Sequence, residues 1–147
     1  MRNVAWILAL FSCASFALAQ GSSCVDVGIF DTRLPTYPPI ARAAHMQGVF
    51  RFTVVVHPDG HSDVSFLDGP SKGVFQILVA SSREFLEGRR YGWATGGDHQ
   101  ACQYTAEVEY RMLPEEVDSP NNFMRVTDID LSHTLVEVKA TKPTINY

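Results

Sequence analysis

The sequence predicts an α+β domain, and three patterns carry that prediction. Between residues 50 and 56, apolar side chains alternate with more polar ones, which is the period of a half-buried strand. Residues 103–112 alternate in the same way. From Val74 to Leu86, apolar residues instead recur at helical spacing. Strands on both sides of one helix predict a small antiparallel sheet with the helix packed on one face.

The first segment predicts export. Met1 to Ala19 has a cationic start at Arg2, an apolar stretch, and a small-residue end at Ala17-Leu18-Ala19. The apolar stretch is shorter than the roughly 20 residues that a helix needs to span a bilayer. We therefore expect a cleaved signal peptide, a mature start at Gln20 and a periplasmic protein. The alternative is an uncleaved segment that anchors the chain in the inner membrane.

Composition bounds the function. Cleavage would leave 128 of the 147 residues, enough for one domain, and would remove one basic and no acidic residue, so the net charge changes from −4 to −5. This acidic balance argues against nucleic acid as a partner. The chain has no Gly-x-Ser-x-Gly elbow and no complete phosphate loop. We expect no cofactor and a binding protein rather than an enzyme.

The cysteines predict one disulfide. Cys13 would leave with the signal segment, so the mature chain keeps Cys24 and Cys102 in an oxidising compartment. A bridge between them would tie the N-terminal arm to the chain around Cys102. The alternative is two unpaired thiols.

The N-terminal elements are short. Residues 20–33 form an arm, in which the imperfectly alternating patch from Val25 to Phe30 is compatible with a short strand. The prolines from Pro35 to Pro39 impose an extended entry to one or two helical turns over Ile40 to Met46. Gly48 ends that helix.

The central elements are a hairpin and a helix. The strand of residues 50–56 turns at Pro58-Asp59-Gly60, and Val64 and Phe66 resume the alternation. The helix of Val74 to Leu86 should pack across this hairpin and end at Gly88. Its charged residues, together with three that follow it, predict a solvated surface: Arg83, Glu84, Glu87, Arg89 and Arg90. Tyr91 to Ala101 is predicted to be a loop.

The strand Gln103 to Met112 has one buried and one solvated face, and Pro114 ends it. Glu115 to Asn122 is predicted to be a linker. Beyond it, Phe123 to Leu131 and Thr134 to Thr141 are compatible with two further strands or with a tail. The predicted organisation is a signal peptide (1–19), an arm (20–33), a domain (34–113), and a linker with a C-terminal extension (114–147).

The order and spacing of these elements carry a resemblance. Tyr37-Pro38-Pro39-Ile40-Ala41-Arg42, then Gly48-Val49, a strand, Pro58-Asp59-Gly60, a strand, a helix and a closing strand resemble the TonB C-terminal domain family from Leu34 to Leu113. The resemblance implies a three-stranded antiparallel sheet with a long helix on one face, to which the C-terminal extension can add strands. It also implies a periplasmic module that binds short peptide segments of outer-membrane transporters or related partners and is linked to transmembrane transport.

The sequence also departs from that family. Energy-transducing members have an uncleaved N-terminal membrane helix and a long proline-rich spacer, neither of which is visible here. The helix end also differs, since this chain has Arg89-Arg90-Tyr91-Gly92-Trp93 where the family tends to have tryptophan, arginine, an aromatic residue and proline. These departures weaken the expectation of energy coupling and of transporter binding at this corner.

The exposed edge of a small sheet can accept a strand from a partner. We expect the edge to be the strand Gln103 to Met112, and the candidate partner-binding residues are Arg90, Tyr91, Gln103, Thr105, Glu107, Glu109 and Arg111. The expected partner is a cell-envelope protein of the TonB-dependent transporter type, and the sequence leaves the oligomeric state open. Alternatively, the strands of the extension pair with this edge and make a self-capped structural domain of an envelope assembly.

A third alternative is a small metal-binding enzyme that uses His57 and His61. The Pro-Asp-Gly turn between these histidines already explains the segment, so we expect no metal site and no catalytic residues.

Overall fold

The computed structural model describes residues 22–114, 123–128 and 130–139. The predicted signal segment Met1 to Ala19 and the linker residues Glu115 to Asn122 lie outside these ranges, so both stay predictions. The elements are β1 (Ser22–Ser23), β2 (Val27–Asp31), α1 (Pro39–Ala43), β3 (Gly48–Val56), β4 (Ser62–Asp68), α2 (Phe75–Glu87), β5 (Arg90–Trp93), β6 (Cys102–Leu113), β7 (Met124–Asp128) and β8 (His133–Lys139). The α+β class is confirmed. In the described part of the chain, no helix has the length and apolarity needed to cross a membrane.

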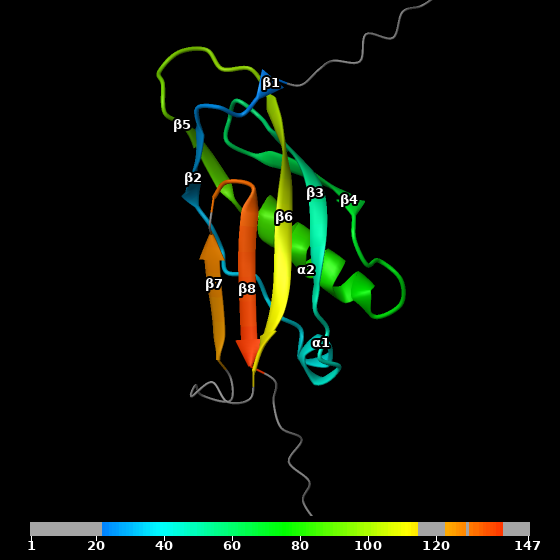
Figure 1. Ribbon diagram of the computed structural model, residues 1–147. Coiled ribbons are helices and arrows are strands. Elements are labelled where there is room, and N and C mark those ends of the chain that lie inside the picture. The colour runs from blue at the N-terminus through cyan, green and yellow to red at the C-terminus, as the bar shows by residue number, and fades with distance from the viewer. Residues whose placement is uncertain (1–21, 115–122, 129, 140–147) are drawn as a thin grey trace, which may run out of the picture.

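The main sheet is larger than predicted. Its strands follow the order β4-β3-β6-β8-β7, and β1 also pairs with β6 (Figure 1). The expected three-stranded antiparallel unit is the part β4-β3-β6, and the sheet departs from it because β8 joins β6 in parallel. The C-terminal extension adds two strands because β8 carries its own inward apolar row, in which Val136 and Val138 are fully buried.

The β3–β4 hairpin has the predicted alternation. Phe50, Phe52, Val54 and Val56 of β3 are fully buried. The turn depends on Gly60, whose φ of 84° favours glycine. A Cβ at this position would also lie 2.5 Å from the carbonyl oxygen of Tyr91, and the Gly60 carbonyl accepts a hydrogen bond from the Tyr91 N–H at 3.1 Å. The hairpin turn therefore fixes the start of β5.

The helix α2 covers one face of the sheet, behind β3 and β6 in Figure 1. It buries Leu78, Phe85 and Leu86, as its apolar spacing predicts. Ser82 is also fully buried, and its hydroxyl donates to the Leu78 carbonyl at 2.7 Å and lies 3.1 Å from the Tyr110 hydroxyl. This pairing satisfies two polar groups inside the core.

A second, two-stranded sheet joins β2 to β5. The first part of the predicted loop Tyr91 to Ala101 is therefore a strand, since β5 covers Arg90 to Trp93 and the N-terminal arm supplies its antiparallel partner. A disulfide joins Cys24 to Cys102, as predicted, and lies next to the parallel pairing of β1 with the start of β6. The arm is thus tied to the main sheet both covalently and through backbone pairing.

Candidate partner-binding site

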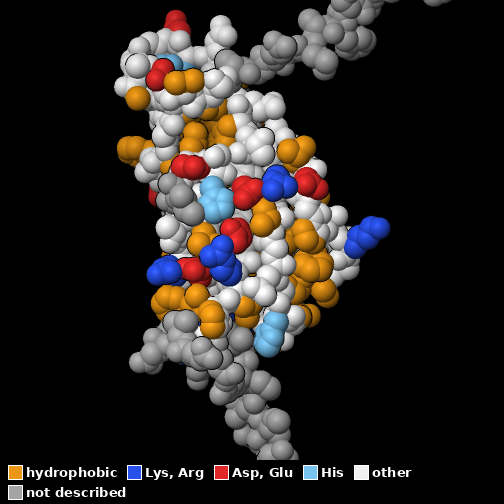
Figure 2. Space-filling view, in the orientation of Figure 1, with side chains coloured by type: hydrophobic (Ala, Val, Ile, Leu, Met, Phe, Trp, Pro, Cys, Tyr) orange, Lys and Arg blue, Asp and Glu red, His pale blue; other side chains and the backbone are white. Residues whose placement is uncertain are grey.

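The candidate residues on β6 share one face, as predicted. Gln103, Thr105 and Arg111 are exposed, and Glu107 and Glu109 are half-buried. Figure 2 shows charged side chains of both signs gathered at the centre of the face that β3, β6 and β8 present in that view. The five residues are therefore brought together on a polar surface of the sheet.

This surface is occupied by its own ion pairs. Arg51 binds Glu107 at 2.9 Å and Asp68 at 3.2 Å, and so links three adjacent strands. Glu109 pairs with Arg111 at 2.6 Å. Exposed pairs of this kind contribute little to stability, about 0 to 1 kcal/mol each. These ion pairs do neutralise the charges that a partner would otherwise recognise.

A histidine joins the network from the extension. The Nε2 atom of His133, at the start of β8, lies 3.5 Å from carboxylate oxygens of both Glu107 and Glu109. Within the extension, Arg125 of β7 binds Glu137 of β8, a residue that is 7% exposed. The contacts of His133 therefore hold the extension to β6 in addition to the backbone ladder, and the Arg125–Glu137 pair joins the two strands of the extension to each other.

The prediction that β6 is an edge strand is wrong. The strand β8 pairs in parallel with residues Glu107 to Leu113, and β1 pairs with Cys102 and Gln103. On that side, only the short stretch from Tyr104 to Ala106 has no strand partner among the described residues. The sequence indicated this outcome only as an alternative, because alternation in the extension does not reveal which strand it joins.

Arg89 anchors the extension. Its side chain was expected on a solvated surface but is fully buried, and it stacks over the Phe85 ring at 4.6 Å. The guanidinium donates to the Leu131 carbonyl at 3.4 Å and to the Thr134 hydroxyl. The charged-surface prediction therefore fails at this residue, because the turn between β7 and β8 covers it and supplies acceptors.

Arg90 and Tyr91 do not join the other candidates. Arg90 is exposed on β5, opposite Asp31 of β2. Tyr91 is 5% exposed, and its hydroxyl lies 2.7 Å from that of Tyr104, whose side chain is half-buried. Burial, and then the neighbouring Tyr91, raises the pKa of Tyr104. This tyrosine pair is a contact between β5 and β6 rather than part of an exposed binding face.

The histidines of the hairpin turn each have a local acidic neighbour. His57 lies 2.7 Å from Asp63, and His61 lies 3.2 Å from Asp59. The backbone N–H of His61 lowers the pKa of Asp59. Within the described ranges, no group of three or more histidine, cysteine or acidic side chains is placed to hold a metal ion. The turn is a local polar structure on the exposed end of the hairpin.

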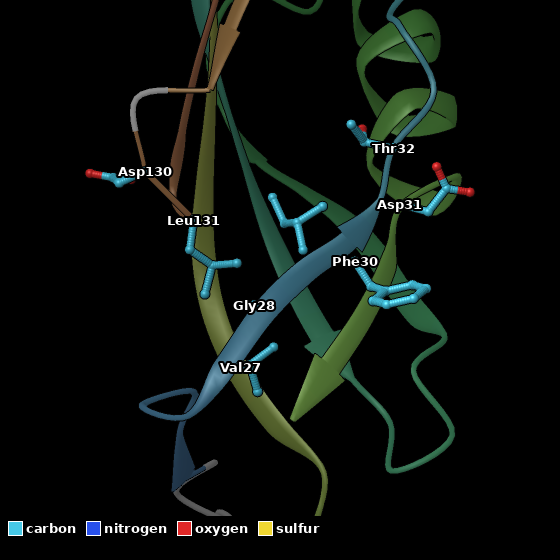
Figure 3. A pocket seen from close by; sticks show the side chains of 8 residues that line it. Val27, Gly28, Phe30, Asp31, Thr32, Asp130 and Leu131 are labelled. Atoms are coloured by element: carbon cyan, nitrogen blue, oxygen red, sulfur yellow. The ribbon is translucent and has the colours of Figure 1, made fainter. Parts of the chain in front are cut away.

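A groove lies beside β2 and was not among the predicted sites. It has a volume of about 580 Å³ and is lined by residues Val27 to Thr32 together with Asp130 and Leu131. Figure 3 shows the Leu131 side chain pointing toward β2, with Phe30 on the opposite side of that strand. The apolar patch from Val25 to Phe30 was the available signal in the sequence, but it did not reveal the segment that faces it.

Comparison with known proteins identifies the fold. Among solved structures, the chain is similar to the TonB C-terminal domain of Pseudomonas aeruginosa, determined in solution by NMR, with a TM-score of 0.52 and 20% identity. The match covers 62% of this chain and 93% of that domain. The chain has a TonB C-terminal domain-like fold. No protein-family model matches the sequence, and no curated protein does.

The match to the TonB C-terminal domain covers part of this chain. Nearly all of the Pseudomonas domain is matched, whereas more than a third of this chain lies outside the match. At this identity the likeness concerns the fold alone, and the role of the chain has to be argued from its own surfaces.

Proposed function

We propose that this chain is an extracytoplasmic TonB-like module, not an enzyme, that binds an extended segment of a cell-envelope protein by strand addition. The disulfide supports an oxidising compartment such as the periplasm. The TonB C-terminal domain-like fold supports a protein partner, and the partner class we propose is an outer-membrane transporter. In this role the chain takes part in transmembrane transport.

One observation carries the proposal. In the described part of the chain, β2, β4, β5 and β7 each pair with a strand on one side only. An edge strand has backbone N–H and C=O groups that can pair with an added strand, which gives affinity through main-chain hydrogen bonds. The proposal is therefore compatible with the pairing of β6 with β8, because a partner strand can add to another edge.

A pull-down from envelope extract tests this function. The protein, purified with its disulfide formed, is expected to retain a specific envelope protein, and a synthetic peptide from that protein should compete. The same bait, reduced and unfolded, serves as the control. Retention of nothing beyond the control would contradict partner binding.

The pairing of β6 with β8 favours a second candidate function. The extension occupies seven positions of β6, and the buried Arg89 holds its turn. In this alternative the chain is a self-capped structural domain of an envelope assembly, and the closed sheet is its final state.

Removing residues 115–147 separates the two functions. A self-capped structural domain should lose stability to chemical denaturation and gain no affinity for partner peptides. A partner-binding module should instead change its affinity for those peptides: binding tightens if the extension competes for β6, and weakens if residues 130–131 of the extension help to form the binding site. Both quantities can be measured on the same preparation, and the intact chain is the reference.

A further inference from the structure

The free edge of β2 faces the groove described above. The Asp26 carbonyl accepts a hydrogen bond from the Ala94 N–H at 2.8 Å, so the backbone groups of residue 26 point toward β5. Backbone groups alternate in direction along an antiparallel strand. Those of Gly28 therefore also face β5, in its pair with Gly92. The N–H and C=O groups of Val27 and Ile29 are directed to the other edge, which has no strand partner among the described residues.

The groove has the dimensions of an extended segment. The six residues from Val27 to Thr32 form one wall, which corresponds to about 20 Å of extended chain. Its volume of about 580 Å³ lies in the usual range for binding pockets. A wall made of strand backbone suits a peptide better than a compact small molecule, because only an extended chain can pair with it along its length.

The lining combines apolar side chains with two carboxylates. Val27, Ile29 and Leu131 are partly buried against the core and form the apolar part. The charged residues among those lining the groove are Asp31 and Asp130, and both carboxylates point outward at its rim (Figure 3). A bound segment would therefore meet apolar side chains along the groove and negative charge at its rim.

An exposed aromatic residue extends this surface. Phe30 is 87% exposed although it belongs to β2. Beside it lies a hollow of about 230 Å³ over the glycine pair, lined by Gly28, Ile29, Phe30, Gly92, Trp93 and Ala94. Neither glycine has a side chain to fill this space. A large apolar side chain from an added strand can pack against Phe30 over the hollow.

Both walls of the groove are fixed in advance. The disulfide at Cys24 ties the chain just before β2 to β6. On the opposite wall, the Asp130 carboxylate accepts hydrogen bonds from the backbone N–H groups of Ser132 and His133 at 2.7 and 2.8 Å. Arg89 donates a hydrogen bond to the Leu131 carbonyl. A preformed groove lowers the entropy cost of binding.

We propose that the free edge of β2 receives an extended segment of a partner protein that carries alternating apolar residues and a lysine or arginine. Main-chain hydrogen bonds to Val27 and Ile29 hold the segment in register, and Asp31 or Asp130 attracts its cation. This inference rests on the proposed function and deepens it, because it names the edge and the partner chemistry. The β6 edge serves the extension, and the β2 edge serves the partner.

The test uses a capped synthetic hexapeptide of alternating valine and threonine with lysine at its N-terminus. Titrated into the full chain with its disulfide formed, it is expected to shift and protect the amide signals of Val27 and Ile29 in ¹H–¹⁵N NMR spectra. Signals of the other edges, such as Val64 of β4 and Val126 of β7, should stay unchanged. Replacing the peptide's lysine with glutamate should weaken binding.

Matched substitutions locate the effect. Phe30→Ser should weaken peptide binding by about threefold to fivefold, the size of one lost cross-strand contact. Leu34→Ser is the control, because Leu34 is 71% exposed on the same segment but does not line the groove. Both side chains are solvated, so neither change should alter the fold.

The outcomes separate this inference from the proposed function. Peptide-induced shifts at β4 or β7 alone would overturn the β2 site and leave partner binding intact. No shift at any edge would overturn the site, and together with an empty pull-down it would overturn the function as well. Concentration-dependent dimers that Phe30→Ser abolishes would assign the groove to a second copy of this chain, which also overturns the proposal.

Discussion

Two strand edges of this protein differ: the outer edge of β6 is paired, and the outer edge of β2 is not paired with any described strand. On its outer side, β6 is paired along most of its length, with β1 at the start and β8 over residues Glu107 to Leu113. The strand β2 pairs with β5 alone and faces a groove on its other side. The disulfide lies where β1 pairs with β6, and the buried Arg89 contacts the start of β8. The comparison indicates that contacts made by β8 outside the backbone ladder help to close the β6 edge, whereas an unpaired edge can pair with another chain.

The largest expected effect comes from cutting the covalent tie. Replacing both Cys24 and Cys102 with serine removes a crosslink between residues 78 positions apart. In the chain-entropy account this costs about 4 kcal/mol of unfolding free energy, because the unfolded chain gains freedom. Urea unfolding followed by circular dichroism measures the loss.

The same variant shows whether the two edges are coupled. We expect the β2–β5 pairing to loosen and the β6–β8 pairing to persist, which amide hydrogen exchange can resolve strand by strand. Equal loss of protection in β2 and β8 would show that the disulfide supports both edges, and the contrast drawn above would fail.

The buried arginine should have the next largest effect. Arg89→Ala removes the donors to Leu131 and Thr134 and leaves a cavity over Phe85. We expect a loss of about 3 kcal/mol in unfolding free energy. The adjacent Arg90→Ala is the matched control and should change stability by less than about 0.5 kcal/mol, because Arg90 is exposed. Chemical denaturation measures both variants, and similar losses in the two would contradict the anchoring role of Arg89.

A smaller effect concerns the contact between β5 and β6. Burial raises the folded-state pKa of Tyr104 above its ordinary value of 10.0, so the folded state favours the neutral phenol. Its stabilising contribution is therefore complete below pH 10 and is lost as the pH rises beyond it. Tyr104→Phe should flatten the decline in stability above pH 10, measured as melting temperature against pH. An unchanged decline would assign it to other groups.

Much of the fold was predictable because its local patterns agree. The alternation of Phe50 to Val56, the turn at Gly60 and the helical spacing from Val74 to Leu86 each report burial on one face, and burial is a property of the residue and its near neighbours. The disulfide was predictable from cysteine number and compartment. These features needed no knowledge of distant contacts.

The sites were harder to predict for a physical reason. Alternation shows that β6 has a solvated face, but it does not show whether another strand covers its edge. Arg89 has the chemistry of a surface residue and is buried only because Leu131 and Thr134, more than forty positions away, provide acceptors. The groove likewise needs two segments that are about a hundred positions apart.

Local residue types were enough to predict the periods of the strands and the helix, the turn chemistry, the cysteines of the disulfide and the resemblance to TonB C-terminal domains. Which edge is closed and which is open depends on contacts between residues that are far apart in the chain. Any strand can donate and accept backbone hydrogen bonds at an edge, so backbone chemistry alone does not select which strand pairs there. In this molecule, the buried Val136 and Val138 and the contacts of Arg89 hold the extension on β6, and no strand of the described residues pairs with the free edge of β2.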